Sequence, residues 1–70
     1  MNSVRISIDG LQQSETQEKV REQLESVIGV QSVCLSAGQT YVDVDYDEQT
    51  SDIELQNHLH NNGYKIMDKN

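Results

Sequence analysis

The sequence predicts an α+β fold in which a four-stranded antiparallel sheet carries two helices on one face. Short runs of alternating apolar and polar residues are typical of half-buried strands, and apolar residues three or four positions apart are typical of amphipathic helices. These patterns follow one another as strand, helix, strand, strand, helix, strand. Right-handed crossovers then place the first and third strands in the centre of the sheet. This is the ferredoxin-like βαββαβ sandwich, and 70 residues have room for one such domain, residues 1–70.

Residues 4–8 alternate between apolar and polar side chains and predict the first strand. Ser14 lies three residues before Gln17, the spacing of a capping box, so we expect the first helix to begin there. The helix continues along an apolar stripe formed by Val20, Leu24, Val27 and Ile28. Gly29, just beyond the stripe, is expected to end the helix as a left-handed cap.

A hairpin is expected after this helix. Its first strand covers residues 30–36, with Cys34 on the face opposite the core, and a turn at residues 36–39 leads into the next strand. That strand covers residues 41–46, with its even-numbered residues pointing inward. The hairpin therefore supplies the second and third strands of the sheet.

A second capping box, Ser51 with Glu54, predicts the start of the second helix. Leu55 and Leu59 are one helical turn apart and are expected in the core. The Asn-Asn-Gly sequence at residues 61–63 closes this helix, and residues 64–67 are expected to form the last strand.

Composition excludes several function classes. Twelve acidic against five basic residues give a net charge of −7, which repels the phosphates of nucleic acids and anionic membranes. The longest apolar run is two residues, so no membrane insertion is expected. One cysteine cannot build a disulfide framework, which favours the cytoplasm. The small size and the lack of a nucleophile beside a base argue against an enzyme.

Several short motifs, taken in order, resemble the heavy-metal-associated (HMA) domain. This family contains copper chaperones and the amino-terminal domains of copper-transporting ATPases. The resemblance runs from about Val4 to Met67 and rests on Ile8-Asp9-Gly10-Leu11, Gly29-Val30-Gln31-Ser32-Val33, Val42-Asp43-Val44-Asp45-Tyr46-Asp47 and Gly63-Tyr64. It implies the same βαββαβ fold and a role in metal homeostasis.

The loop before the first helix departs from the family pattern. In the family it reads Gly-Met-x-Cys-x-x-Cys, and two thiolates hold a soft ion such as Cu(I). Here Gln13 and Thr16 occupy the two cysteine positions, and Leu11 replaces the methionine. Amide and hydroxyl oxygens are neutral, hard ligands that do not hold Cu(I) competitively. We therefore expect no metal cofactor at this loop.

Other residues with ligand-type side chains do not form an evident site. Cys34 is a single thiol on an expected edge strand, and an inert or solvent-facing thiol is the expected interpretation. His58 and His60 are two residues apart on a helix, which separates their directions by about 200°. We expect His58 to flank the core and His60 to face solvent.

The acidic residues of the third strand have the spacing of a calcium loop. Asp43, Asp45 and Asp47, with Glu54, match its first, third, fifth and twelfth positions. However, the sixth position holds Glu48 instead of glycine, and no helix precedes the motif. A solvated acidic sheet face explains the same residues, so we expect no calcium site.

The resemblance implies a protein-interaction module of copper homeostasis without the family's own metal site. Partners of the family meet this loop, the start of the first helix and the Gly-Tyr loop. Carried over by position, the expected contact residues are Leu11, Gln12, Gln13, Ser14, Thr16 and Tyr64. The expected partner is a protein with a basic patch, such as a metal-transport ATPase or another domain of the same fold, and the chain is expected to be a monomer or a weak dimer.

Two alternatives remain at this stage. The chain is a metal-binding chaperone if Cys34 or His58, supplied across a dimer, provides non-standard ligands for a heavy-metal ion. It is a purely structural domain if no surface residue matters beyond solubility.

Overall fold

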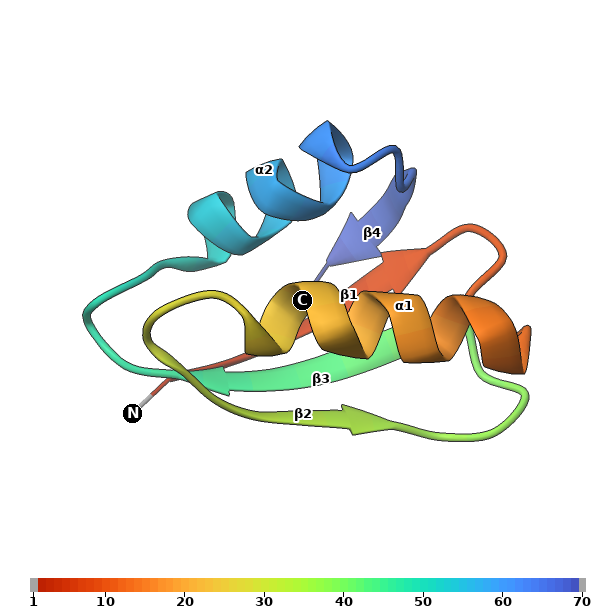
Figure 1. The fold of residues 1–70 in the computed structure, drawn as a ribbon, viewed down its shortest axis with the longest axis horizontal. Helices are drawn as coiled ribbons and strands as arrows, with labels where there is room; N and C mark the ends of the chain where they lie inside the picture. The colour runs from red at the N-terminus through yellow and green to blue at the C-terminus, as the bar shows by residue number, and fades with distance from the viewer. Residues whose placement is uncertain (1, 70) are drawn as a thin grey trace.

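The computed structural model describes residues 2–69 and confirms the predicted fold class (Figure 1). The elements are β1 (Asn2–Ile8), α1 (Ser14–Glu25), β2 (Val30–Leu35), β3 (Tyr41–Tyr46), α2 (Asp52–Asn61) and β4 (Ile66–Lys69). The strands form one antiparallel sheet in the order β2-β3-β1-β4, so β1 and β3 are central as expected. Within the described residues, no helix is long and apolar enough to cross a membrane.

The core lies between the sheet and the two helices, which cover the same face. Alternate residues of the central strands point into it, and Ile6 of β1 pairs with Val42 of β3 across the sheet. The largest fully buried side chains are Ile6, Ile8, Leu11, Val20, Leu24, Val42, Val44, Leu55 and Leu59. Every expected core residue of α2 is therefore confirmed, as are Val20 and Leu24, the first two residues of the α1 stripe.

The end of α1 differs from the prediction. The helix ends at Glu25 rather than at Ile28, and Ser26 caps it with a hydroxyl that donates to the carbonyl oxygen of Gln23 (2.7 Å). Ile28 lies in the following loop and is 76% exposed, so its expected place in the core was wrong. Val27 still packs against the core from outside the helix.

Gly29 does not cap the helix, but the loop after the helix requires a glycine at this position. Its φ is +103°, and a Cβ there would lie 3.0 Å from the Asp47 Oδ1 atom and 3.0 Å from the Gln49 Cβ. Its carbonyl oxygen also accepts a hydrogen bond from the Asp47 amide (2.8 Å). The residue therefore joins the α1–β2 loop to the β3–α2 loop. Its positive φ and the close approach of the second loop both exclude a side chain at this position.

The junction between α2 and β4 also differs from the prediction. The amides of Gly63 and Tyr64 donate to the carbonyl oxygens of His60 and Leu59 (3.0 Å each), the pattern of a Schellman cap. Gly63 supplies the positive φ, +91°, that this cap needs. Because Tyr64 belongs to the helix cap, the last strand begins at Ile66, two residues later than expected.

Candidate functional site

The loop between β1 and α1 is held from both sides. Its own turns are closed by bonds from the Leu11 amide to the Ile8 carbonyl and from the Gln13 amide to the Gly10 carbonyl (3.2 Å each). The Asp9 amide donates to the carbonyl oxygen of Lys65 (3.0 Å), which brings the segment after Tyr64 beside the loop. The structure therefore brings together the two loops that the resemblance to the HMA domain places in one surface (Figure 1).

The first turn of α1 has no side-chain cap. Gln13, not Ser14, is the N-cap residue, and its side chain makes no capping hydrogen bond, so the predicted capping box was wrong. The first helical bond runs from the Gln17 amide to the Gln13 carbonyl (3.0 Å), which leaves the amides of Ser14, Glu15 and Thr16 without intrahelical acceptors. The Gln17 side chain instead donates to the Ser36 carbonyl (2.9 Å).

We expect Gln13→Ser to stabilise the protein. Gln13 already has the extended backbone of an N-cap (φ −79°, ψ 132°), and a serine hydroxyl there can accept from a free amide of the first turn. The expected gain is about 1 kcal/mol, or roughly 4–8 °C in melting temperature for a domain of this size. Thermal denaturation measures it, with Gln12→Ser, one residue outside the cap, as the control. Equal melting temperatures of Gln13→Ser and the wild type would contradict the assignment of the cap.

Of the six expected contact residues, five reach the surface. Gln12, Gln13 and Ser14 are exposed, and Thr16 and Tyr64 are half-buried. Leu11 is fully buried in the core, so its expected role as a partner contact is corrected: its side chain anchors the loop from inside. We call the five residues that reach the surface, Gln12, Gln13, Ser14, Thr16 and Tyr64, the loop surface.

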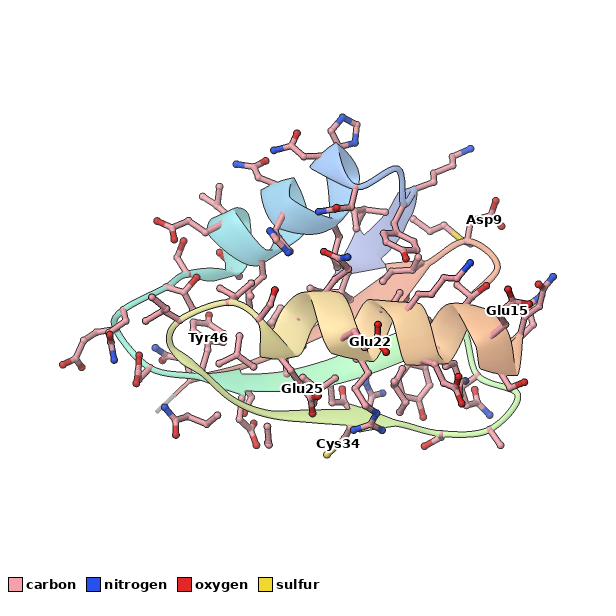
Figure 2. All side chains as sticks on the ribbon, viewed as in Figure 1. Asp9, Glu15, Glu22, Glu25, Cys34 and Tyr46 are labelled. Carbon is pink, nitrogen blue, oxygen red and sulfur yellow. The ribbon has the colours of Figure 1, made fainter. Side chains whose placement is uncertain are left out.

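The chemistry of the loop surface is that of hydrogen bonding. Its side chains are amides, hydroxyls and one phenol, which are neutral donors and acceptors. Two carboxylates lie on either side of this surface: Asp9 begins the loop, and Glu15 is the second residue of α1 (Figure 2). Among the described residues, no group of three or more histidine, cysteine, aspartate or glutamate side chains is placed to hold a metal ion. The loop surface therefore presents neutral hydrogen-bonding groups with a carboxylate on either side.

The residues of the alternative metal site lie on different sides of the sheet. Cys34 is exposed on β2, on the face away from the helices, and Figure 2 shows it at the far edge of the sheet from α2. His58 is on α2, half-buried, and its Nε2 atom is buried without a hydrogen-bond partner. His60 is exposed, as expected. One chain therefore does not bring Cys34 and His58 together.

The open face of the sheet pairs its own charged groups. The Arg5 guanidinium donates to Asp43 through Nε (2.8 Å) and Nη2 (3.3 Å) and lies 4.1 Å from the Tyr41 ring centroid. The hydrogen bond to Asp43 raises the pKa of Arg5 above its usual value. Hydroxyl donors from Ser3 and Ser32 lower the pKa of Asp45 below its usual value.

The other two carboxylates that match the spacing of a calcium loop, Asp47 and Glu54, accept hydrogen bonds from neighbouring groups. Asp47 accepts from the side chain of Gln31 (2.8 Å) and from the amide of Gln49 (2.9 Å), and Glu54 accepts from Thr50 (3.3 Å). Asp43 and Asp45 lie on the extended strand β3. The four carboxylates are thus distributed over separate hydrogen-bonded contacts.

Solved structures of metallochaperones and metal-binding domains are similar to this chain. CsoZ metallochaperone matches with a TM-score of 0.81 at 22% identity, over 96% of this chain and 97% of that one. Oxidized MerP from Ralstonia metallidurans matches with a TM-score of 0.83 at 24% identity, over 94% and 93%. A copper binding domain from a P-type ATPase matches with a TM-score of 0.83 at 18% identity, over 99% and 97%.

These likenesses show the fold. The chain has an HMA-like fold, because each match extends over nearly the full length of both compared chains with a high TM-score. No protein-family model matches the sequence, and no curated protein matches it either.

Sequence reasoning missed two features of this region. The Lys65 carbonyl that holds the Asp9 amide is a backbone group, and backbone groups leave no signal in residue identities. The bond from Gln17 to Ser36 was hidden because Gln17 also fitted a capping box. Both contacts connect residues distant in sequence.

Proposed function

We propose that this chain is a protein-interaction module of copper homeostasis that binds a partner through the loop surface and holds no metal at the family's ligand positions. The observation that carries the proposal is the placement of Gln13 and Thr16 at the N-cap and third residue of α1. In the family that the chain resembles, two thiolates occupy these positions. An amide and a hydroxyl there keep the surface and remove its soft-metal ligands.

The similar solved structures support the part of this proposal that concerns metal homeostasis. They are metallochaperones and a copper binding domain from a P-type ATPase. By analogy, the partner is the metal-binding domain of a metal-transport ATPase or another domain of this fold. We propose a cytoplasmic location and a monomeric state for the free chain.

The charge of the chain indicates the character of the partner. The net charge is −7, and Asp9 and Glu15 flank the loop surface. A partner with a basic patch is attracted to this region, whereas a partner of the same sign is repelled. Added salt screens the attraction, because the Debye length falls from about 10 Å at 0.1 M to about 3 Å at 1 M.

A nuclear magnetic resonance titration tests the proposal. The labelled chain is titrated with the soluble metal-binding domain of a metal-transport ATPase from the same organism. We expect shift changes at Gln12, Gln13, Ser14, Thr16 and Tyr64, and an affinity that decreases as salt is added. Gln13→Ala should weaken binding by about tenfold, the usual order of effect for a residue in the centre of an interface.

The control is Gln49→Ala, an exposed loop glutamine near the α1–β2 loop, which should bind as the wild type does. Shift changes confined to the open face around Arg5 and Cys34 would contradict the proposed surface. An affinity independent of salt would contradict the charge argument.

A further inference from the structure

β2 is an edge strand that carries no charged residue. Its sequence, Val-Gln-Ser-Val-Cys-Leu, contains two valines that favour strands and no charged side chain, although 24% of the whole chain is charged. Edge strands present unpaired amides and carbonyls to other chains, and proteins usually protect them with charges or with very short strands. The opposite edge, β4, follows this rule, since it is a strand of only four residues. β2 lacks such protection within its own sequence.

The hydrogen-bonding pattern identifies the groups that β2 leaves free. The Ile8 amide donates to the Thr40 carbonyl, and by alternation the even-numbered residues of β3 bond to β1. The odd-numbered residues of β3 therefore bond to β2, where Asp43 and Asp45 pair with Cys34 and Ser32. Val33, between these two, directs its amide and carbonyl away from β3, towards the open edge.

Arg21 of α1 occupies this edge. Its Nη1 atom donates to the carbonyl oxygen of Val33 (3.0 Å) in a partly buried contact. The same guanidinium lies 3.9 Å from Glu25, one helical turn further along α1. One turn earlier, Gln17 donates to the Ser36 carbonyl, just beyond the end of β2. A charged side chain from the helix thus lies where a strand from another molecule would have to pair.

We propose that Arg21 blocks the β2 edge, and that the partner excluded by this contact is the β2 strand of a second copy of the chain. An antiparallel pairing centred on Val33 places Val33 opposite its copy and Ser32 opposite the second copy's Cys34. No like charges meet in this arrangement, because residues 30–36 are uncharged. The net charge of −7 on each copy still opposes association, but this uncharged edge adds no local contact between like charges.

The test is the oligomeric state of Arg21→Met, measured by sedimentation over a range of concentrations. Methionine keeps an unbranched stem and a similar helix propensity but removes the donor and the charge. We expect the mass to rise towards twice that of the monomer as concentration increases, while the wild type remains monomeric. In the variant, amide exchange at Val33 and Leu35 should slow with concentration, which locates the contact at β2.

Lys19→Met is the matched control. It makes the same change in net charge on the same helix, but Lys19 contacts Glu15 and not β2, so this variant should stay monomeric. Adding Cys34→Lys to Arg21→Met puts a charge on the edge strand itself and should restore the monomer.

Two outcomes would overturn the proposal. One is a folded Arg21→Met variant that remains monomeric at all concentrations. The other is concentration-dependent protection of the Val33 amide in the wild type, which would show that the edge is open despite Arg21. This second measurement needs no variant, so the proposal remains testable if Arg21→Met does not fold.

Discussion

Leu11→Ala is expected to lower the free energy of unfolding by about 2–5 kcal/mol, the usual cost of removing a buried leucine side chain. Leu11 is fully buried although it lies in a loop, and its side chain is part of the core beneath the loop surface. A domain of this size has a total stability of roughly 3–10 kcal/mol, so the loss should be a large share of the total. Chemical denaturation followed by circular dichroism measures the change.

Ile28→Ala provides the matched control for this prediction. It removes the same number of carbon atoms, and Ile28 also lies outside the helices and strands, but its side chain is 76% exposed. Its stability should change by less than about 0.5 kcal/mol, as is usual for surface substitutions. If Leu11→Ala were as stable as Ile28→Ala, Leu11 would not anchor the loop. The original expectation, that the Leu11 side chain contacts a partner, would then be favoured again.

Leu11 and Ile28 show which features of the fold could be predicted from the sequence and which could not. Alternation in the central strands and the spacing of Val20, Leu24, Leu55 and Leu59 reflect burial directly, and the structure confirms these positions. Ile28 fitted the same helical spacing but lies beyond the end of α1. The helix ends early because Ser26 caps it and Gly29 must pack against the β3–α2 loop, and the second of these is a contact between distant segments.

The candidate site was predictable in position but not in detail. The resemblance to the HMA domain implied that the loops around Gly10 and Gly63 form one surface, and the bond from Asp9 to Lys65 brings them together. The depth of Leu11 could not be predicted, since a leucine between Gly10 and polar residues fits either a loop anchor or an exposed contact. The start of α1 depends on the turns that close on Ile8 and Gly10, which is why Gln13 and not Ser14 is the cap.

The double variant Gln13→Cys/Thr16→Cys is expected to acquire tight, one-to-one binding of Cu(I). Gln13 is the N-cap and Thr16 the third residue of α1, and side chains at these positions approach each other, as they do in a capping box. The free amides of the first turn favour thiolate over thiol, and Cu(I) prefers sulfur ligands. Competition with a coloured Cu(I) chelator measures the affinity. At a free-ion concentration of about 1,000 times Kd, binding should add about 4 kcal/mol to the stability.

Gln13→Ser/Thr16→Ser controls for this prediction, because serine differs from cysteine by one oxygen in place of sulfur and should not compete for Cu(I). The two double variants and the unsubstituted chain are best compared in a Cys34→Ser background, which removes the native thiol. A double cysteine variant that fails to bind Cu(I) would show that this loop lacks the geometry of a two-thiolate site. Equal binding by the serine control would instead place the metal elsewhere in the chain. If only the cysteine variant binds, the identity of two side chains alone separates this surface from a soft-metal site.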